Sequence, residues 1–227
     1  MYWIIFLGFL ILSVVVQQKL TNRVEKYSKE FLPSGLTGRE IAEKMLRENG
    51  ISDVKVTCIN GVLTDHYNPL NKTLNLSKGV YEGSNVAAAA VAAHECGHAV
   101  QHSEAYHWLM LRSAMVPVVN IGGRFSTWVI LAGLLLMSFS ESAWGYHVAI
   151  IGIALFALTT IFAFVTLPVE YDASNRALAW LESSNIAIGV SHDHAKDALR
   201  WAARTYVVAA LASLAYLLYY ISLVNRR

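Results

Sequence analysis

The segment from Val91 to His102, VAAHECGHAVQH, closes a run of alanines with two histidines and a glutamate. The alanines predict a buried helix, because alanine has the highest helix propensity and lets neighbouring elements pack closely. Imidazole and carboxylate groups cost free energy when they leave water without partners. Three of them together on an apolar helix therefore indicate a bound partner, and a divalent metal ion is the partner that suits these groups.

The spacing of the polar residues predicts how such an ion would be held. Residues four apart share one helix face, so His94 and His98 can offer two imidazole nitrogens to one ion. Glu95 can reach a water molecule on that ion and accept its proton, as in the HExxH metallopeptidases, where zinc lowers the pKa of the water from about 15.7 to about 7. The alternative is two surface histidines beside a solvated glutamate. The uncharged flanks and the small Gly97 argue against it.

The composition places the chain in a membrane. Of its 227 residues, 55% are hydrophobic and only 15% are charged, which is too apolar for a soluble domain. A bilayer core needs about 20 apolar residues in a helix. Four stretches of suitable length predict transmembrane helices, over 1–18, 113–140, 142–169 and 205–225. The first has neither a basic start nor a cleavage site, so we expect a retained anchor and not a signal peptide.

The charged residues predict the orientation. Lysines and arginines gather in 19–112 and 170–204, whereas the loop around Glu141 has none. By the positive-inside rule both polar segments face the cytoplasm, although Arg226 and Arg227 would then lie outside. Two cysteines without framework spacing fit a reducing compartment. We therefore expect a multi-pass protein of the cell membrane whose active site faces the cytoplasm, with no nucleic-acid footprint in its charge of +2.

A catalytic zinc site takes three protein ligands and leaves the fourth position to water. The candidates for the third ligand are His66, His102, Glu104, Glu141, His147, Glu170, Asp172, Glu182, His192 and His194. The predicted topology disfavours Glu141 and His147, which fall near the far side of the bilayer. Glu170, in LPVEYDASNRAL (167–178), comes directly after an apolar stretch. From the residues alone, a metal ligand and an ordinary interfacial glutamate are equally good interpretations of Glu170.

The polar segment 19–112 predicts a small α+β domain. TGREIAEKMLRENG (37–50) begins with a capping box of Thr37 and Glu40 and stops at Gly50, which predicts a helix. Alternating residues in DVKVTCI (53–59), with Val54, Val56 and Cys58 inward, and in KTLNLS (72–77), with Leu74 and Leu76 inward, predict two short strands that could form a hairpin.

The helix that carries the histidines is predicted over 84–102, capped by Ser84 or Asn85. Peptide substrates commonly add a strand to a sheet edge beside a catalytic helix. Because 72–77 comes just before the helix, we expect it to be that edge. Cys96 faces away from the metal side and is expected to pack.

These segments predict a mainly α membrane protein with about four transmembrane helices and a small α+β cytoplasmic domain with a short β-sheet. The expected order is a helix at 1–18, the domain at 19–112, helices at 113–140 and 142–169, a third-ligand helix with a cytoplasmic loop at 170–204, and a helix at 205–225.

VAAHECGHAVQH and LPVEYDASNRAL together resemble the YugP-like membrane zinc metallopeptidases, a neutral zinc metallopeptidase family distantly similar to the gluzincins of the HtpX and CAAX prenyl protease group. The similarity extends through SGLTGREIAEKMLRENG, LTDHYNPLNKTLNLS, RSAMVPVVNIG and WAARTYVVAAL, and so covers most of the chain. The resemblance implies one Zn²⁺ per chain, with His94, His98 and Glu170 as ligands and Glu95 as the catalytic base.

One position departs from the HtpX-type pattern, which has an aspartate four residues after the ligand glutamate to orient a zinc-bound imidazole. This chain has Ser174 there. Ser174, Asp172 or another group could supply that support. A metallopeptidase also needs a donor for the oxyanion. The candidates are Tyr171, Arg176, His192, His194 and Tyr206, and none is favoured over a packed or solvated role.

Three functions from different classes remain. The leading hypothesis is a membrane-embedded zinc endopeptidase that cleaves membrane-associated polypeptides. A non-catalytic zinc-binding membrane scaffold is the alternative, but a structural site would not need Glu95 and would close its fourth position. A metal or proton transporter would place ionisable residues inside its spans, and the four charge-free stretches, with the second counted over 125–140, hold only His147. The oligomeric state and the substrate sequence are not indicated.

Overall fold

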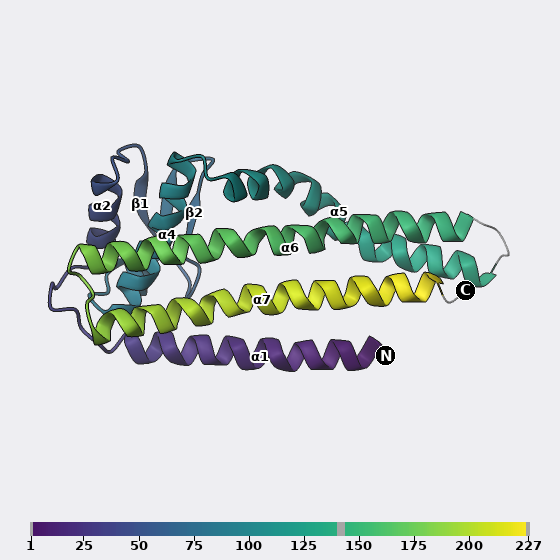
Figure 1. The fold of residues 1–227 in the computed structure, drawn as a ribbon, viewed down its shortest axis with the longest axis horizontal. Coiled ribbons are helices and arrows are strands. Elements are labelled where there is room, and N and C mark those ends of the chain that lie inside the picture. Colours follow the sequence, from purple (N-terminus) through teal and green to yellow (C-terminus); the bar gives the residue numbers. More distant parts are fainter. Residues whose placement is uncertain (1, 140–143, 226–227) are drawn as a thin grey trace. The chain divides into compact units, whose positions relative to one another are not determined.

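The computed structural model describes residues 2–139 and 144–225. The chain divides into two compact units, each described by itself. We call 1–14, 110–167 and 206–227 the helical unit, and 15–109 with 168–205 the α/β unit. The elements in chain order are α1 (Tyr2–Tyr27), α2 (Gly38–Glu48), β1 (Lys55–Ile59), β2 (His66–Asn68), β3 (Thr73–Ser77), α3 (Lys78–Tyr81), α4 (Val86–Ser103), α5 (His107–Phe139), α6 (Trp144–Ser183) and α7 (Val190–Asn225) (Figure 1).

Four helices, α1, α5, α6 and α7, are long and apolar enough to cross a membrane. The prediction of a mainly α protein with four such helices and a short sheet is confirmed. The helices run well past the apolar stretches: α6 has 40 residues, about 60 Å at 1.5 Å per residue, which is about twice a bilayer core. Pro168 lies inside α6. The predicted boundaries at residues 1, 140 and 142, and Glu141, lie outside the described residues.

Small residues allow α5 and α6 to approach closely within the helical unit. A Cβ placed on Gly152 of α6 would lie 2.6 Å from the backbone nitrogen of Ile130 on α5. One placed on Gly145 would lie 2.6 Å from the backbone nitrogen of Met137. Close backbone contact through glycine is the usual way in which apolar helices pack where lipid removes the hydrophobic driving force.

The core of the α/β unit surrounds α4. Ile41 and Met45 of α2 and Leu74 and Leu76 of β3 are at most 1% exposed and pack in the same cluster as the alanines of α4. The capping box of Thr37 and Glu40 is present at the start of α2. The two apolar faces predicted from periodicity are therefore those that meet α4, which fixes where the polar end of that helix lies.

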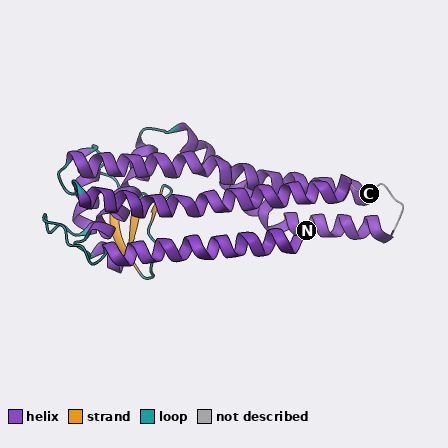
Figure 2. Cartoon of the chain, turned by 60° about the horizontal axis from the view of Figure 1, so that its bottom comes forward, coloured by secondary structure: helices purple, strands orange, loops and turns teal. Residues whose placement is uncertain are grey.

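The short sheet differs from the expected hairpin. Its order is β1-β3-β2, with β1 parallel to β3 and β2 antiparallel to β3, and the strands appear orange in Figure 2. The hairpin prediction was wrong because HYN (66–68), too short to show alternation, forms a third strand within the connection from 60 to 72. Segment 72–77, expected at the edge, is therefore central. Cys58, expected inward, is exposed on the edge strand β1.

The start of α4 yields a first prediction. The side chain of Asn85 accepts a hydrogen bond from the amide of Ala88 and caps the helix, so Asn85 and not Ser84 is the N-cap. Asn85→Ala should lower the free energy of unfolding by about 1 kcal/mol, because an amide at the helix start loses its acceptor. Chemical denaturation in detergent, followed by circular dichroism, measures the loss. Ser84→Ala is the control, and an equal loss in both variants would contradict the assignment.

Candidate metal centre

Two histidines of α4 and a glutamate of α6 meet inside the α/β unit. The Nε2 atoms of His94 and His98 lie 3.4 Å and 3.7 Å from Oε2 of Glu170. One ligand atom from each residue lies within 4.8 Å of the others. His98 is 8% exposed and Glu170 only 3%. Of the ten candidates for the third position, the structure thus brings Glu170 to the two imidazoles.

The donor set fits a zinc ion. Ligand atoms about 2.0–2.1 Å from a tetrahedral ion lie about 3.3 Å from one another, close to the separations between Glu170 and each imidazole. Two imidazoles and one carboxylate are the ligands of one common catalytic zinc site, which keeps its fourth position open. Burial would lower the pKa of the His98 imidazole, but the hydrogen bond and charge of Glu170 outweigh burial and raise it. The cluster is thus electrostatically suited to a cation.

Ser174 supports His94. It lies one turn after Glu170 on α6, and its Oγ is 3.1 Å from His94 Nδ1. When Nδ1 carries the ring proton and donates it to Oγ, Nε2 keeps its lone pair for the side where Glu170 lies. The residue that departs from the HtpX-type pattern therefore contacts the imidazole of His94.

Gln101 supports His98, and the sequence analysis missed it. Its Oε1 lies 3.0 Å from His98 Nδ1, and its Nε2 donates to Val169 O and to Asp172 Oδ2, each at 2.8 Å. Gln101 is 0% exposed. Asp172 acts on the site through this amide, and it also accepts from Nε of Arg176 at 2.6 Å. A signal was available, because Gln101 is a polar residue three positions after His98 and so shares its helix face.

Glu95 is held by the edge strand of the sheet. Its Oε2 accepts a hydrogen bond of 3.0 Å from the backbone amide of Tyr67 on β2, and the side chain is 8% exposed. The Tyr67 hydroxyl hydrogen-bonds with Nδ1 of His102 at 2.8 Å, and burial raises the pKa of that hydroxyl. Both ends of Tyr67 are therefore tied to α4, a link that no sequence pattern indicated.

Cys96 lies between the two histidines in sequence but points the other way. It is 0% exposed, and its Sγ donates to the carbonyl oxygen of Ala42 on α2 at 3.5 Å. Burial, aided by the charge of Glu95, raises the pKa of the thiol well above its ordinary value. The expectation that Cys96 serves packing is confirmed.

Other candidate ligands have different partners. His66 is exposed on β2 and contacts Thr64 O at 2.9 Å. Glu104 binds Arg176 at 2.7 Å, and His194 binds Glu30 at 2.6 Å. Glu182 and His147 are exposed.

The structure does not single out a residue that would donate a hydrogen bond to the oxyanion, and the candidates have different surroundings. Arg176 is engaged by Asp172 and Glu104, and His194 by Glu30. Within the described chain, Nε2 of His192 is buried without a hydrogen-bond partner. Tyr171 is 44% exposed. Tyr206 belongs to the helical unit and stays a prediction.

Two imidazoles and a carboxylate, buried together and supported through their outer atoms, form a group that could hold a metal ion, with the donor types that catalytic zinc sites use. Comparison with known proteins agrees. The family model described as "Putative neutral zinc metallopeptidase" matches residues 2–225. The chain is 40% identical over 210 residues to "Putative membrane protease YugP" of Bacillus subtilis (strain 168), which covers 92% of this chain and 90% of that protein. No solved structure matches the chain. The chain belongs to this neutral zinc metallopeptidase family, as the sequence motifs indicated.

Gly97 sets the distance between the two helices of the site. A Cβ on Gly97 would lie 2.6 Å from the carbonyl oxygen of Ala173 on α6, closer than real Cβ contacts allow. Gly97→Ala should force α4 and α6 apart, draw both imidazoles away from Glu170, and weaken zinc binding by about tenfold or more. Competition with a chelator measures the affinity. Gly79→Ala, where a Cβ meets nothing within 4 Å, is the control, and unchanged affinity in the Gly97 variant would contradict this account.

Gln101→Leu tests the support of His98. The substitution leaves His98 Nδ1 and Asp172 without the buried amide between them, and loss of such support commonly costs 10–100-fold in metal affinity. We expect a loss in that range, measured by the same chelator competition. Gln18→Leu, on an exposed position of α1, is the matched control. Wild-type affinity in Gln101→Leu would show that the amide only fills space.

Proposed function

We propose that the protein is a zinc-dependent endopeptidase of the cell membrane that hydrolyses peptide bonds with Glu95 as the general base. The observation that carries the proposal is the meeting of His94, His98 and Glu170 in one buried cluster, with Glu95 on the same helix as the imidazoles. The family to which the chain belongs and the printed description of its Bacillus subtilis relative as a membrane protease support it.

The side chains of the site divide the work. Zn²⁺ bound to the three ligands would supply a Lewis acid that polarises the substrate carbonyl and makes hydroxide available near neutral pH. Glu95 takes up the proton released during attack and returns it to the leaving amine. The amide of Tyr67 holds one oxygen of this carboxylate, so the other oxygen carries the proton. Ser174 and Gln101 keep the imidazoles in place throughout.

The substrate would bind along β2. The amide of Tyr67 donates to Glu95, so this residue turns its backbone away from β3 and toward α4. β2 is an edge strand of the sheet, and an extended peptide can add to an edge strand through the main-chain groups that the Tyr67–Glu95 bond leaves available, which makes recognition tolerant of sequence. We therefore propose the edge strand β2 as the substrate-binding strand, instead of the segment 72–77, which is central in the sheet.

The proposed location is the cell membrane, with the site facing the cytoplasm. Four helices of membrane-spanning length support the first part, and the concentration of basic residues in 19–112 and 170–204 supports the second. Glu170 follows a charge-free stretch directly in sequence. Polypeptides anchored in or lying on the membrane are therefore the proposed substrates.

Glu95→Gln is the decisive variant, because it removes the base and keeps the ligands. We expect one zinc per chain, as in wild type, and a kcat/KM for an unfolded membrane-protein substrate lower by about 10²–10⁴-fold. Metal analysis and proteolysis of the full chain in detergent measure both. Glu82→Gln, at an exposed glutamate, is the control. Wild-type cleavage with zinc retained would refute the mechanism, and a wild type that binds zinc without cleaving would favour the scaffold.

A further inference from the structure

A cavity lies between α6 and α7 within the α/β unit. It has a volume of about 250 Å³ and receives the basic side chains of Lys196 and Arg200 from α7. Tyr171 and Asn175 of α6 line its opposite wall. Ser174 also borders the cavity. Its hydroxyl contacts Nδ1 of His94, whereas Nε2 on the other side of that ring lies toward Glu170. The cavity is therefore separate from the space between the three ligand atoms.

The charges in this cavity are not balanced by the protein. Lys196 and Arg200 are four residues apart on one helix face, where like charges repel. The structure gives neither of them an ion pair within 2–139 and 144–225, and the cavity lining includes no carboxylate. Two nearby acids are used elsewhere: Asp197 binds Arg23 at 3.1 Å, and Asp172 binds Arg176, whereas Asp193, one turn before Lys196 on α7, is exposed. An anion bound from outside the chain would neutralise the charges of Lys196 and Arg200.

Two of the lining residues, Arg200 and Tyr171, lie within about one headgroup layer of a charge-free stretch along their helices, whereas Lys196, about 13.5 Å of helix before Thr205, reaches that layer only through its long side chain. Arg200 precedes the charge-free stretch that starts at Thr205 by five residues, about 7.5 Å of helix. Tyr171 follows the end of another, at Val169, by two residues, about 3 Å. The polar headgroup layer on each side of a bilayer core is about 5–8 Å thick. Tyrosine is also a preferred residue at that boundary.

We propose that this cavity binds the phosphate group of an anionic membrane lipid. Lys196 and Arg200 neutralise the phosphate, and Asn175 and the Tyr171 hydroxyl donate hydrogen bonds to its oxygens or to the glycerol. Arg204, one turn further along α7, stacks on Trp201 with 4.1 Å to the ring centroid and is not needed for this contact. The proposal does not depend on peptidase activity.

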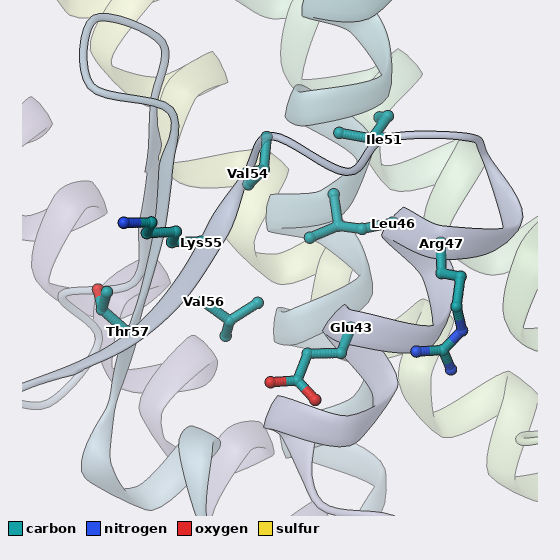
Figure 3. Close-up of a pocket in the computed structure, with 8 residues that line it drawn as sticks. All are labelled: Glu43, Leu46, Arg47, Ile51, Val54, Lys55, Val56 and Thr57. Atoms are coloured by element: carbon teal, nitrogen blue, oxygen red, sulfur yellow. The ribbon is translucent and has the colours of Figure 1, made fainter.

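A different cavity supplies the matched control. The pocket of about 400 Å³ between α2 and β1 also holds two cations, Arg47 and Lys55, but Glu43 lies among them (Figure 3). The helices long and apolar enough to cross a membrane are α1, α5, α6 and α7, so this pocket lies on other elements. This pocket has the same number of cations, with Glu43 bound to Arg39 at 2.7 Å, but its elements are not helices of membrane-spanning length, so it should not select an anionic lipid.

Lipid retention by the purified full chain tests the proposal. The protein in detergent is titrated with phosphatidylglycerol, with phosphatidylcholine or with inorganic phosphate, and bound lipid is counted by native mass spectrometry. We expect wild type to bind phosphatidylglycerol in preference to phosphatidylcholine. Lys196→Gln with Arg200→Gln should weaken that binding about 25-fold, or about fivefold for each charge removed. Arg47→Gln with Lys55→Gln should leave it within twofold of wild type.

A charge-preserving variant separates a built site from general attraction. Asn175→Leu keeps both cations but removes a donor, so phosphatidylglycerol binding should still fall several-fold. Equal binding by wild type and the Lys196 and Arg200 double variant would overturn the proposal. So would an equal loss in the Arg47 and Lys55 control. Displacement of the lipid by inorganic phosphate at the same concentration would assign the cavity to a soluble phosphate and overturn the lipid assignment.

Discussion

The burial of the Glu170 carboxylate against two imidazoles is the constraint on which the α/β unit depends. An ionised carboxylate that is 3% exposed is costly unless charged or polar groups meet it. His94 and His98 meet it only because α4 and α6 approach closely, with Gly97 against the backbone of Ala173. The alanines of α4, buried against α2 and β3, keep that helix in position. The packing of small residues in α4 thus determines how closely the imidazoles approach Glu170.

The supports around the cluster come from several parts of the chain. Ser174 on α6 holds His94, whereas Gln101 on α4 holds His98 and is itself bound to the backbone of α6 at Val169. Glu95 is held from a third direction, by β2. The three-strand sheet therefore does more than cover the core, since its edge strand fixes the carboxylate that we assign as the base. The short strand HYN is part of the site.

Local patterns in the sequence predicted the helices and the pairing of His94 with His98, whereas Glu170 was favoured only by the family resemblance. The capping box of α2, the apolar faces that meet α4 and the i, i+4 histidines each depend on residues close in sequence. The order of the strands could not be predicted from these patterns. A three-residue strand shows no alternation, and its position is set by contacts with α4 and β3. The roles of Gln101 and Tyr67 could not be predicted because they arise from contacts with segments distant in sequence. The extents of α6 and α7 could not be taken from the apolar stretches, because an end to the apolar residues does not end a helix.

The orientation of Cys96 has a consequence for the durability of the site. A thiolate beside two imidazoles would capture soft metal ions such as copper(I) or cadmium and would be open to oxidation. Here the thiol is fully buried and directed at a backbone carbonyl on α2, so it stays protonated and out of reach of peroxide. The helix can thus carry a cysteine between the two histidines of the candidate metal centre without placing a reactive thiol beside them.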